Sequence, residues 1–209
     1  MFGMIKKDMF MIKNNLKSIM ATLIIFIFYT IMFDMNITFF LPFMTLMICI
    51  STFSYDDFNN WHSYASVLPS GKVNVVKSKY ITTIIFIIVM VFISLLLSIC
   101  ISSFRGSINL DEILSTVIGE LFAIVFIMSI LFPVLFKYGA EKGRIVMLMV
   151  GISIMGIILF ITNSIKIRVS NSLIVFLDLY FPIIFLIVAI LLISISYFIS
   201  KRIYLKKEF

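Results

Sequence analysis

The stretch DDFNNWHSYASVLPSGKVNVVKSKY, residues 56–80, is the one long polar passage in a chain otherwise dominated by Phe, Ile, Leu and Met. It carries the only Trp and the only His, two adjacent acids, a Leu-Pro pair and several spaced lysines. The apolar runs elsewhere in the chain approach or exceed the roughly 18 residues typical of a transmembrane helix. The stretch is therefore predicted to be a loop between two membrane spans.

The composition of the chain supports a membrane location. Of its 209 residues, 62% are hydrophobic and 13% are charged, and the mean hydropathy is +1.19. A soluble globular protein averages about 25% charged residues, so the sequence predicts an integral membrane protein. The net charge of +7 is interpreted as a topology signal rather than as a sign of nucleic acid binding.

The sequence offers few ligands for a metal and no evident disulfide. One His and two widely separated cysteines are too few for a zinc site. Cys49 and Cys100 both fall inside apolar runs, and the predicted topology places them toward opposite faces of the bilayer. We expect both to be small buried hydrophobes without a disulfide between them.

The apolar runs predict an all-α fold with six transmembrane helices in a single domain, 1–209. The expected spans are residues 18–33, 37–53, 80–101, 113–136, 145–162 and 181–200. The first run lacks a small-residue cleavage pattern after it, so it is interpreted as a retained span. Because proline suits the first turn of a helix, the sixth span is expected to start near Phe181 or Pro182. Residues 164–180 would then form an outer segment, amphipathic or partly re-entrant.

The basic residues predict the orientation of these spans. With both termini in the cytoplasm, every Lys and Arg except Arg105, Lys166 and Arg168 faces the inner side. Such a bias toward the inside is the usual one for multi-pass membrane proteins. We therefore predict an N-in, C-in topology in a bacterial plasma membrane, with residues 54–79 as the first and largest cytoplasmic loop.

The first part of this loop has the periodicity of an amphipathic helix. Its apolar positions are Phe58, Trp61, Ala65 and Leu68. Asp56 and Asp57 are expected at the start of this helix, where the helix dipole favours negative charge. Pro69 is expected to end it, because the residue before a proline is pushed out of helical geometry.

The second part of the loop is expected to form another short helix, capped by Ser70. The apolar spacing continues through Val73, Val76 and Tyr80, while Lys72, Lys77 and Lys79 leave charge on the other sides. One interpretation is an anchor on the inner leaflet, which would suit the amphipathic rings of Trp61 and Tyr64. The other is a docking surface for a soluble partner. Spacing alone does not choose between them.

The loop resembles the signature of small six-span ABC-2-type permeases of ABC transporters. The matching residues, in order, are Asp56, Asp57, Trp61, Tyr64, Leu68, Pro69, Ser70, Lys72, Val76, Lys79 and Tyr80. Gly71 departs from the pattern, since a larger residue is usual there, and it is expected to loosen the start of the second helix. A second match is FPVLFKYGAEKGR, residues 132–144, which resembles the turn between the fourth and fifth spans of the same permeases and contains Lys137, Glu141 and Arg144. Among type V exporter-like permeases, the chain also resembles the branch that exports phenol-soluble modulins, which are amphipathic peptide toxins.

The resemblance implies a function and a set of partners. Such a permease binds no ATP itself; it couples to separate cytoplasmic ATPase subunits, which hold ATP and Mg, and pairs with a second permease. The coupling residues implied here are Asp56, Asp57, Phe58, Trp61, Tyr64, Leu68, Pro69, Lys72, Lys79, Tyr80, Lys137, Glu141 and Arg144. Consistent with this, the chain contains no G-x-x-x-x-G-K-[ST] phosphate loop. The expected cargo is an amphipathic peptide or another hydrophobic molecule.

Three residues within the spans are candidates for a substrate path or a permease interface. Glu120 is an acid well inside the fourth span, where an ionised group costs on the order of 3 kcal/mol. Its alternative interpretation is a carboxylate that snorkels outward beside Thr116, with Arg105 as a partner. Gly151 and Gly156 in the fifth span would let another helix approach closely.

Other classes of protein remain as alternatives. A CAAX-type membrane protease would need Glu-Glu-x-x-x-Arg and spaced histidines, and neither is present. An ion-coupled transporter usually shows internal repeats and several buried polar groups. The sequence has no evident repeat, and Glu120 alone is expected to be such a group. A non-transporting membrane protein, such as an immunity factor against a peptide, stays open as the main alternative.

Overall fold

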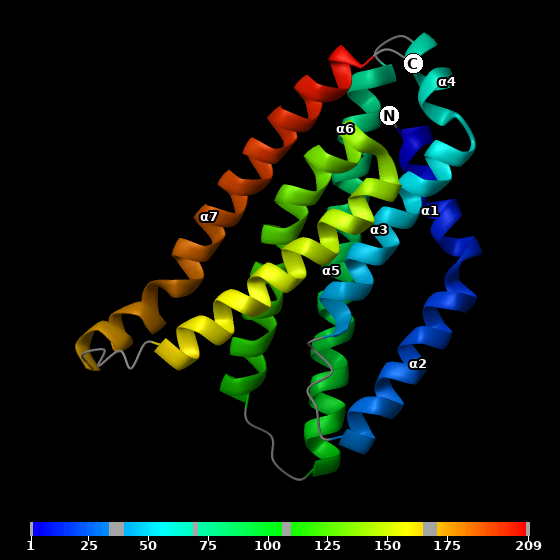
Figure 1. Ribbon diagram of the computed structural model, residues 1–209. Helices are drawn as coiled ribbons and strands as arrows, with labels where there is room; N and C mark the ends of the chain where they lie inside the picture. The colour runs from blue at the N-terminus through cyan, green and yellow to red at the C-terminus, as the bar shows by residue number, and fades with distance from the viewer. Residues whose placement is uncertain (1, 34–39, 69–70, 106–109, 165–170, 208–209) are drawn as a thin grey trace.

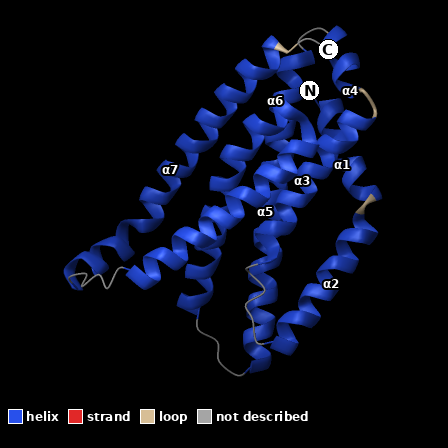
Figure 2. Cartoon of the chain, in the orientation of Figure 1, coloured by secondary structure: helices blue, strands red, loops and turns tan. Residues whose placement is uncertain are grey.

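The computed structural model describes residues 2–33, 40–68, 71–105, 110–164 and 171–207; within these ranges the regular secondary structure is all helix, with short turns between some helices (Figure 2). The helices are α1 (Phe2–Asn14), α2 (Leu16–Phe33), α3 (Phe40–Phe58), α4 (Trp61–Val67), α5 (Gly71–Arg105), α6 (Leu110–Ser164) and α7 (Asn171–Lys206). The all-α prediction is confirmed for the described residues.

The short helix α4 and both ends of the chain lie at the same end of the helical bundle (Figure 1). We call this the polar end, and define it by α4, by the turn at Gly139 and by the C-terminal Lys207. An N-in, C-in topology requires this shared end. The side of the membrane that the polar end faces stays a prediction.

Helix α6 contains a reversal of the chain, which Figure 1 shows where its colour passes from green to yellow. The break is at Gly139, whose φ of 81° and ψ of 179° are not helical. We call residues 110–138 the first half of α6 and residues 140–164 the second half. The turn predicted between the fourth and fifth helices is therefore confirmed.

Three stretches of the described residues are long and apolar enough to cross a membrane: Gly71–Ser103, Ile113–Ser153 and Ile184–Lys206. A fourth results if Phe2–Asn14 and Leu16–Tyr29, which meet at an angle of 56°, count as one broken span. The chain is thus a multi-pass membrane protein. The count of six spans stays a prediction, and the expected hairpin at residues 34–36 lies outside the described residues.

The core is concentrated toward the polar end and is rich in aromatic rings. Phe53 of α3 meets Phe136 of α6 edge to face, with ring centroids 5.0 Å apart. Tyr80 of α5 stacks on Phe132 at 4.5 Å. The Tyr80 hydroxyl also lies 2.7 Å from Ser196 Oγ and 2.9 Å from Ser200 Oγ, both on α7. This core joins α3, α5, α6 and α7, and so fixes the elements that carry the candidate site.

Two boundaries of the polar loop differ from those predicted. Helix α3 runs on through Phe58, so Asp56 and Asp57 lie in its last turn and not at the start of a new helix. Asn60 then adopts a left-handed conformation with φ 50° and reverses the chain into α4. Because of this turn, Phe58 does not share a helix face with Trp61 and Ala65, as the spacing had predicted.

The second short helix of the loop is also not a separate element. Helix α5 runs without a break from Gly71 to Arg105, so the lysines of the loop lie on the first turns of a long apolar helix. Helix α7 similarly begins at Asn171 rather than near Phe181. Pro182 is therefore within α7 and not in its first turn. The bounds of the sixth span and the character of the outer segment stay predictions, and residues 165–170 lie outside the described residues.

The two cysteines have different surroundings. Cys49 is buried in the core and Cys100 is exposed on the surface of α5. Both are free thiols, so the expected lack of a disulfide between them is confirmed. The expectation that both are buried is wrong for Cys100, because its side chain is exposed on α5.

Candidate coupling site at the polar end

An ionic cluster of four side chains joins three helices at the polar end. We call it the ionic cluster; its members are Lys7 and Asp8 of α1, Asp56 of α3 and Lys79 of α5. Lys79 Nζ lies 2.7 Å from Asp56 Oδ2 and 3.1 Å from Asp8 Oδ1, and donates to the Thr52 carbonyl oxygen at 3.1 Å. Lys7 pairs with Asp56 and lies 3.4 Å from Asp8.

Charge balance explains why this cluster can be buried. Asp56, Asp8 and Lys79 are at most 1% exposed, and an unpaired buried charge would be strongly destabilising. Two cations face two anions, so each charge is compensated. Asp56 and Lys79 were predicted to contact a partner, but the structure places them inside the chain. They hold α1, α3 and α5 in position and present no surface.

Trp61 connects this cluster to α4. The Lys7 ammonium lies 4.2 Å from the centre of the Trp61 ring, as in a cation–π contact. Trp61 is also 5.3 Å from the Tyr64 ring and packs against the core. Asp8 was missed in the sequence analysis. The available signal was that it is the one acid among the four lysines before the first apolar run.

Asp57 connects the end of α3 to the turn in α6. Its Oδ2 accepts a hydrogen bond of 2.9 Å from the backbone N–H of Ala140, the first residue of the second half of α6. A carboxylate is stabilised at this place because the helix N-terminus carries unpaired N–H groups and a partial positive charge. Asp57 does cap the start of a helix, as the sequence suggested. That helix is the second half of α6 and not the helix that follows Asp57 in the chain.

Gly139 makes this contact possible. Its φ of 81° with an extended ψ of 179° is a conformation that essentially only glycine adopts. A Cβ atom at this position would also lie 3.1 Å from Asp57 Oδ2. The glycine of the FKYGAEKGR turn is therefore required both by the backbone and by the neighbouring carboxylate.

The single histidine links α4 to the C-terminal helix. His62 Nε2 lies 3.1 Å from Asp57 Oδ1, and His62 Nδ1 lies 2.7 Å from the Tyr204 hydroxyl. Tyr204 is buried against Phe136, with ring centroids 5.3 Å apart. Asp57, His62 and Tyr204 thus form a continuous bridge from α3 through α4 to α7, which the sequence analysis did not foresee.

Opposing effects act on the pKa of Asp57. Partial burial acts to raise it, but the hydrogen bond with His62, the N–H of Ala140 and the nearby charges of His62 and Lys207 outweigh this effect. The pKa of Asp57 is therefore below its ordinary value. The carboxylate form, which caps the second half of α6, is the form that the fold stabilises.

The start of α5 is held to the C-terminal residues. Lys72 Nζ donates to the Lys207 carbonyl oxygen at 2.7 Å, and Lys207 Nζ donates to the Phe136 carbonyl oxygen at 3.4 Å. Gly71 is closely packed, since a Cβ there would lie 1.8 Å from the Ala65 carbonyl oxygen. The expectation that Gly71 loosens this segment is wrong: only glycine lets α4 and α5 approach this closely. Pro69 and Ser70 lie outside the described residues.

A group of apolar side chains remains exposed at the polar end. We call this group the α4 surface; its residues are Phe58, Tyr64, Val67 and Leu68. Phe58 and Val67 are each 85% exposed, whereas Ala65 on the opposite face of α4 is fully buried. Of the residues in the loop 54–79 that were predicted to couple, Phe58, Tyr64 and Leu68 are thus the apolar ones that face outward.

The turn at Gly139 offers a second exposed group, which is polar. Lys137 and Lys142 lie 4.8 and 5.3 Å from the centre of the exposed Tyr138 ring, and Glu141 is exposed beside them. Arg144 points elsewhere: its Nη2 donates to Ser54 Oγ of α3 at 3.1 Å. The structure thus separates Arg144 from Lys137 and Glu141, with which the sequence analysis had grouped it.

Glu120 lies in the first half of α6, away from the polar end. It is 6% exposed, and its Oε2 accepts a 2.7 Å hydrogen bond from Ser94 of α5, while its Oε1 has no partner among the described residues. The alternative interpretation, in which Glu120 snorkels outward beside Thr116, is wrong because the side chain is buried between α5 and α6. The side chain of Arg105, its other suggested partner, is not among those described.

Gly151 and Gly156 lie on an open face of the second half of α6. A Cβ atom at either position would meet nothing within 4 Å, and Ile152 between them is exposed. Among the described residues, therefore, nothing packs against the two glycines closely enough to require them. Their predicted part in an interface between permeases stays a prediction.

The fold and the polar end together define a class of protein: a helical multi-pass membrane protein whose polar residues gather at one end. Comparison of the sequence with known families then places it more closely. The sequence model of the family described as ABC-2 family transporter protein matches residues 3–205, and the chain belongs to this family. The match covers nearly the whole chain, including α4 and the turn at Gly139. No curated protein and no solved structure matches the chain.

Proposed function

We propose that this protein is the permease subunit of an ATP-driven exporter, with its polar end in the bacterial cytoplasm and its α4 surface bound to a separate ATPase subunit. Membership of the ABC-2 transporter family supports the transport function. The main support for the proposed docking site is the difference in burial between the two sides of α4. One side is apolar and exposed, and the other packs against the core.

The length of α5 favours docking over an anchor on the inner leaflet. The helix has 35 residues and is therefore about 50 Å long at 1.5 Å per residue. The hydrocarbon core of a bilayer is only about 30 Å thick. The charged first turns of α5, from Gly71 to Lys79, extend beyond the apolar region, and α4 precedes them along the chain. An exposed apolar surface in water is typical of a site for a protein partner.

The contacts at the polar end would transmit movement of the partner to the helices. ATP and Mg would be bound by the ATPase subunit. A displacement of α4 would act on α7 through His62 and Tyr204, and on α1 through Trp61 and Lys7. Asp57 would carry the same displacement to the second half of α6. Such coupled rigid-body shifts are a common way to switch between two arrangements of helices.

The cargo proposed is an amphipathic peptide or another hydrophobic molecule. A membrane surface rich in Met and Phe suits it, because flexible thioether side chains adapt to varied apolar ligands. We also propose that the permease pairs with a second permease, and that the open face at Gly151 and Gly156 lies in that interface, where small residues allow close helix approach.

A matched pair of substitutions tests the docking site. Phe58 and Phe2 are 85% and 88% exposed, on α3 and α1 respectively, so Phe58→Asp and Phe2→Asp make the same chemical change at equally exposed positions. Co-purification with ATPase subunits encoded nearby, followed by an ATP hydrolysis assay, gives the readout. We expect Phe58→Asp to weaken ATPase binding by about thirtyfold or more, as loss of an interface hot spot does, and Phe2→Asp to leave it unchanged.

Two results would count against the proposal. Equal ATPase binding by both variants would place the docking site elsewhere. If the unmodified chain recovers no ATPase subunit at all, the chain is not part of such a complex, and an immunity factor becomes the better account. Leu68→Asp is a useful second variant on the α4 surface. Trp61→Asp is less informative, since it would also place a charge beside the ionic cluster.

A further inference from the structure

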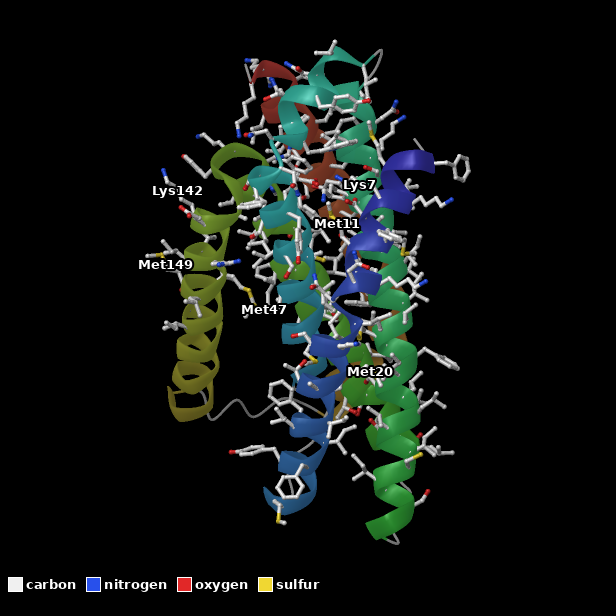
Figure 3. All side chains as sticks on the ribbon, turned by 90° about the vertical axis from the view of Figure 1, so that its right-hand side faces the viewer. Lys7, Met11, Met20, Met47, Lys142 and Met149 are labelled. Carbon is white, nitrogen blue, oxygen red and sulfur yellow. The ribbon has the colours of Figure 1, made fainter. Side chains whose placement is uncertain are left out.

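A groove of about 800 Å³ lies between α1, α2 and α3 and reaches the second half of α6. Its volume is within the roughly 300–1,000 Å³ typical of ligand pockets. The back of the groove is well packed: Ile12 and Ile48 form a buried cluster with Met90 of α5, and the partly buried Ile19 packs against it. Figure 3 shows Met11 and Met47, two of the lining residues, on this side of the molecule.

The lining of the groove changes in polarity along its length. Far from the polar end, where α2 descends and α3 begins (Figure 1), the lining includes Phe26, Met44 and Met47. Near the polar end it includes Asn15 and Tyr55, and the Tyr55 hydroxyl donates to Asn15 Oδ1 at 3.3 Å. An apolar length with a polar mouth is the shape that accepts an amphiphile with one apolar chain.

Arg144 gives the mouth of the groove a positive charge. It is the one charged residue that lines the groove within the described part of the chain. Its guanidinium has five N–H donors, and one is used by Ser54 at 3.1 Å. Among the described residues no carboxylate forms an ion pair with it. The free donors and the uncompensated charge are complementary to an anionic headgroup.

We propose that this groove binds one anionic phospholipid from the surrounding bilayer. Its headgroup phosphate lies at Arg144, which can bind phosphate oxygens with two parallel N–H groups, and one acyl chain lies along Met47 and Phe26. Basic pockets between membrane helices are known to hold anionic lipid headgroups. This site does not depend on pairing with an ATPase. Phe58 lines the groove and also belongs to the α4 surface, so the test uses the isolated membrane protein and leaves Phe58 unchanged.

The test compares substitutions in the groove with equal substitutions beside it. Arg144→Gln and Met47→Trp alter the charge and fill the apolar length. Their controls are Lys142→Gln and Met149→Trp, on exposed residues of the second half of α6 that are labelled in Figure 3. Neither residue lines the groove. Native mass spectrometry of delipidated protein would measure bound phosphatidylglycerol during titration, with phosphatidylcholine as the neutral lipid.

We expect Arg144→Gln to lower the apparent phosphatidylglycerol affinity about tenfold, the effect of one lost charge-assisted hydrogen bond, and Met47→Trp to lower the number of lipids retained. Arg144→Lys should restore part of the affinity, since it keeps the charge but not the paired N–H groups. The two control variants should bind as the unmodified chain does.

Several outcomes would overturn the proposal. Equal phosphatidylglycerol retention in the groove variants and the controls would show that the groove is not a lipid site. Equal affinity for phosphatidylcholine, which has the same phosphate but no net charge, would show that the groove does not select an anionic lipid. If Met47→Trp instead converted a dimer into a monomer with lipid retention unchanged, the occupant of the groove would be a second copy of the chain.

Discussion

At the scale of single residues, the polar loop contains two different kinds of acid. Asp56 is fully buried and compensated by Lys7 and Lys79, whereas its neighbour Asp57 caps a helix from another part of the chain. Both match the same sequence signature, yet neither is free to contact a partner with its whole carboxylate. The residues of the loop signature that are exposed and not held by such contacts are Tyr64 and Leu68, so a partner at the α4 surface would be bound mainly by hydrophobic contact.

Removal of the Asp56 charge should be strongly destabilising. Asp56→Asn leaves Lys7 and Lys79 with Asp8 as their one remaining carboxylate in a buried site, and breaking a buried ion pair costs about 3–5 kcal/mol. Thermal unfolding of the purified variant in detergent would measure the effect. Glu141→Gln, an exposed change, is the control and should alter stability by about 0.5 kcal/mol or less. Similar melting temperatures for both variants would contradict the described cluster.

Gly139 should not tolerate a side chain. Its backbone conformation costs a non-glycine residue about 1–3 kcal/mol, and the new Cβ would press on Asp57 Oδ2. Gly139→Ala is therefore expected to lower the unfolding temperature. Gly119→Ala in the first half of α6 is its control, since a Cβ there meets nothing within 4 Å and alanine is the better helix former. If both changes are neutral, the turn is not held as described.

At the scale of elements, α4 depends on its neighbours for its structure. A helix of seven residues is too short to be stable alone in water. It is held by Trp61 on Lys7, by Ala65 in the core and by His62 between Asp57 and Tyr204. Its stability is therefore a measure of the connection between the loop and the helices α1 and α7.

His62→Ala should release α4 from α7. Loss of two hydrogen bonds is expected to speed amide hydrogen exchange in residues 61–67 by about tenfold or more, because local opening becomes less costly. Hydrogen exchange with mass spectrometry would report it, and Ser63→Ala, an exposed change in the same helix, is the control. Unchanged exchange in the His62 variant would mean that the bridge to Tyr204 does not hold α4.

The cap formed by Asp57 should be sensitive to acid. Its pKa is lower in the folded chain than its ordinary value of 3.8, so its contribution to stability is fully present above about pH 4. That contribution is lost as the pH falls through the lowered pKa. The stability difference between the unmodified chain and Asp57→Asn should therefore be constant near neutral pH and shrink in acid. Unfolding measured from pH 6 to pH 3 tests this, and a difference that grows in acid would contradict it.

At the scale of the whole molecule, the arrangement brings both ends of the chain, α4 and the turn at Gly139 to one end of the bundle (Figure 1). The same end carries most of the basic residues that predicted the topology. The helices leave this end as long apolar rods, with exposed side chains such as Ile88, Phe92 and Ile152, as expected where lipid is the solvent.

The predicted orientation can be tested with single cysteines. In a chain with Cys49 and Cys100 replaced by Ala, Ser63→Cys on α4 should react with a membrane-impermeant maleimide only after the cells are opened. Ser103→Cys, at the other end of α5, should react in intact cells. Both serines are exposed, so access and not burial decides the result. The reverse pattern would invert the topology.

The parts of the fold that could be predicted are those set by local sequence. Apolar runs of membrane length predicted the long helices, because hydropathy is a local signal. The reversal in α6 was predicted from the gap between the runs 113–136 and 145–162, where residues 132–144 also resemble a turn of the family. The boundaries of the loop helices could not be predicted. Helical spacing alone did not reveal that α3 would continue to Phe58 or that α5 would begin at Gly71.

The sequence by itself determined the class of this protein: an all-helical, multi-pass membrane protein, with one polar loop and an asymmetric distribution of basic residues. The tertiary structure alone decided which residues of that loop are buried. It paired Asp56 with Lys7, placed Asp57 on the amide of Ala140 and joined His62 to Tyr204. The reason is physical: composition and periodicity depend on neighbours in the chain, whereas charge compensation and helix capping here depend on groups 49 to 142 positions apart.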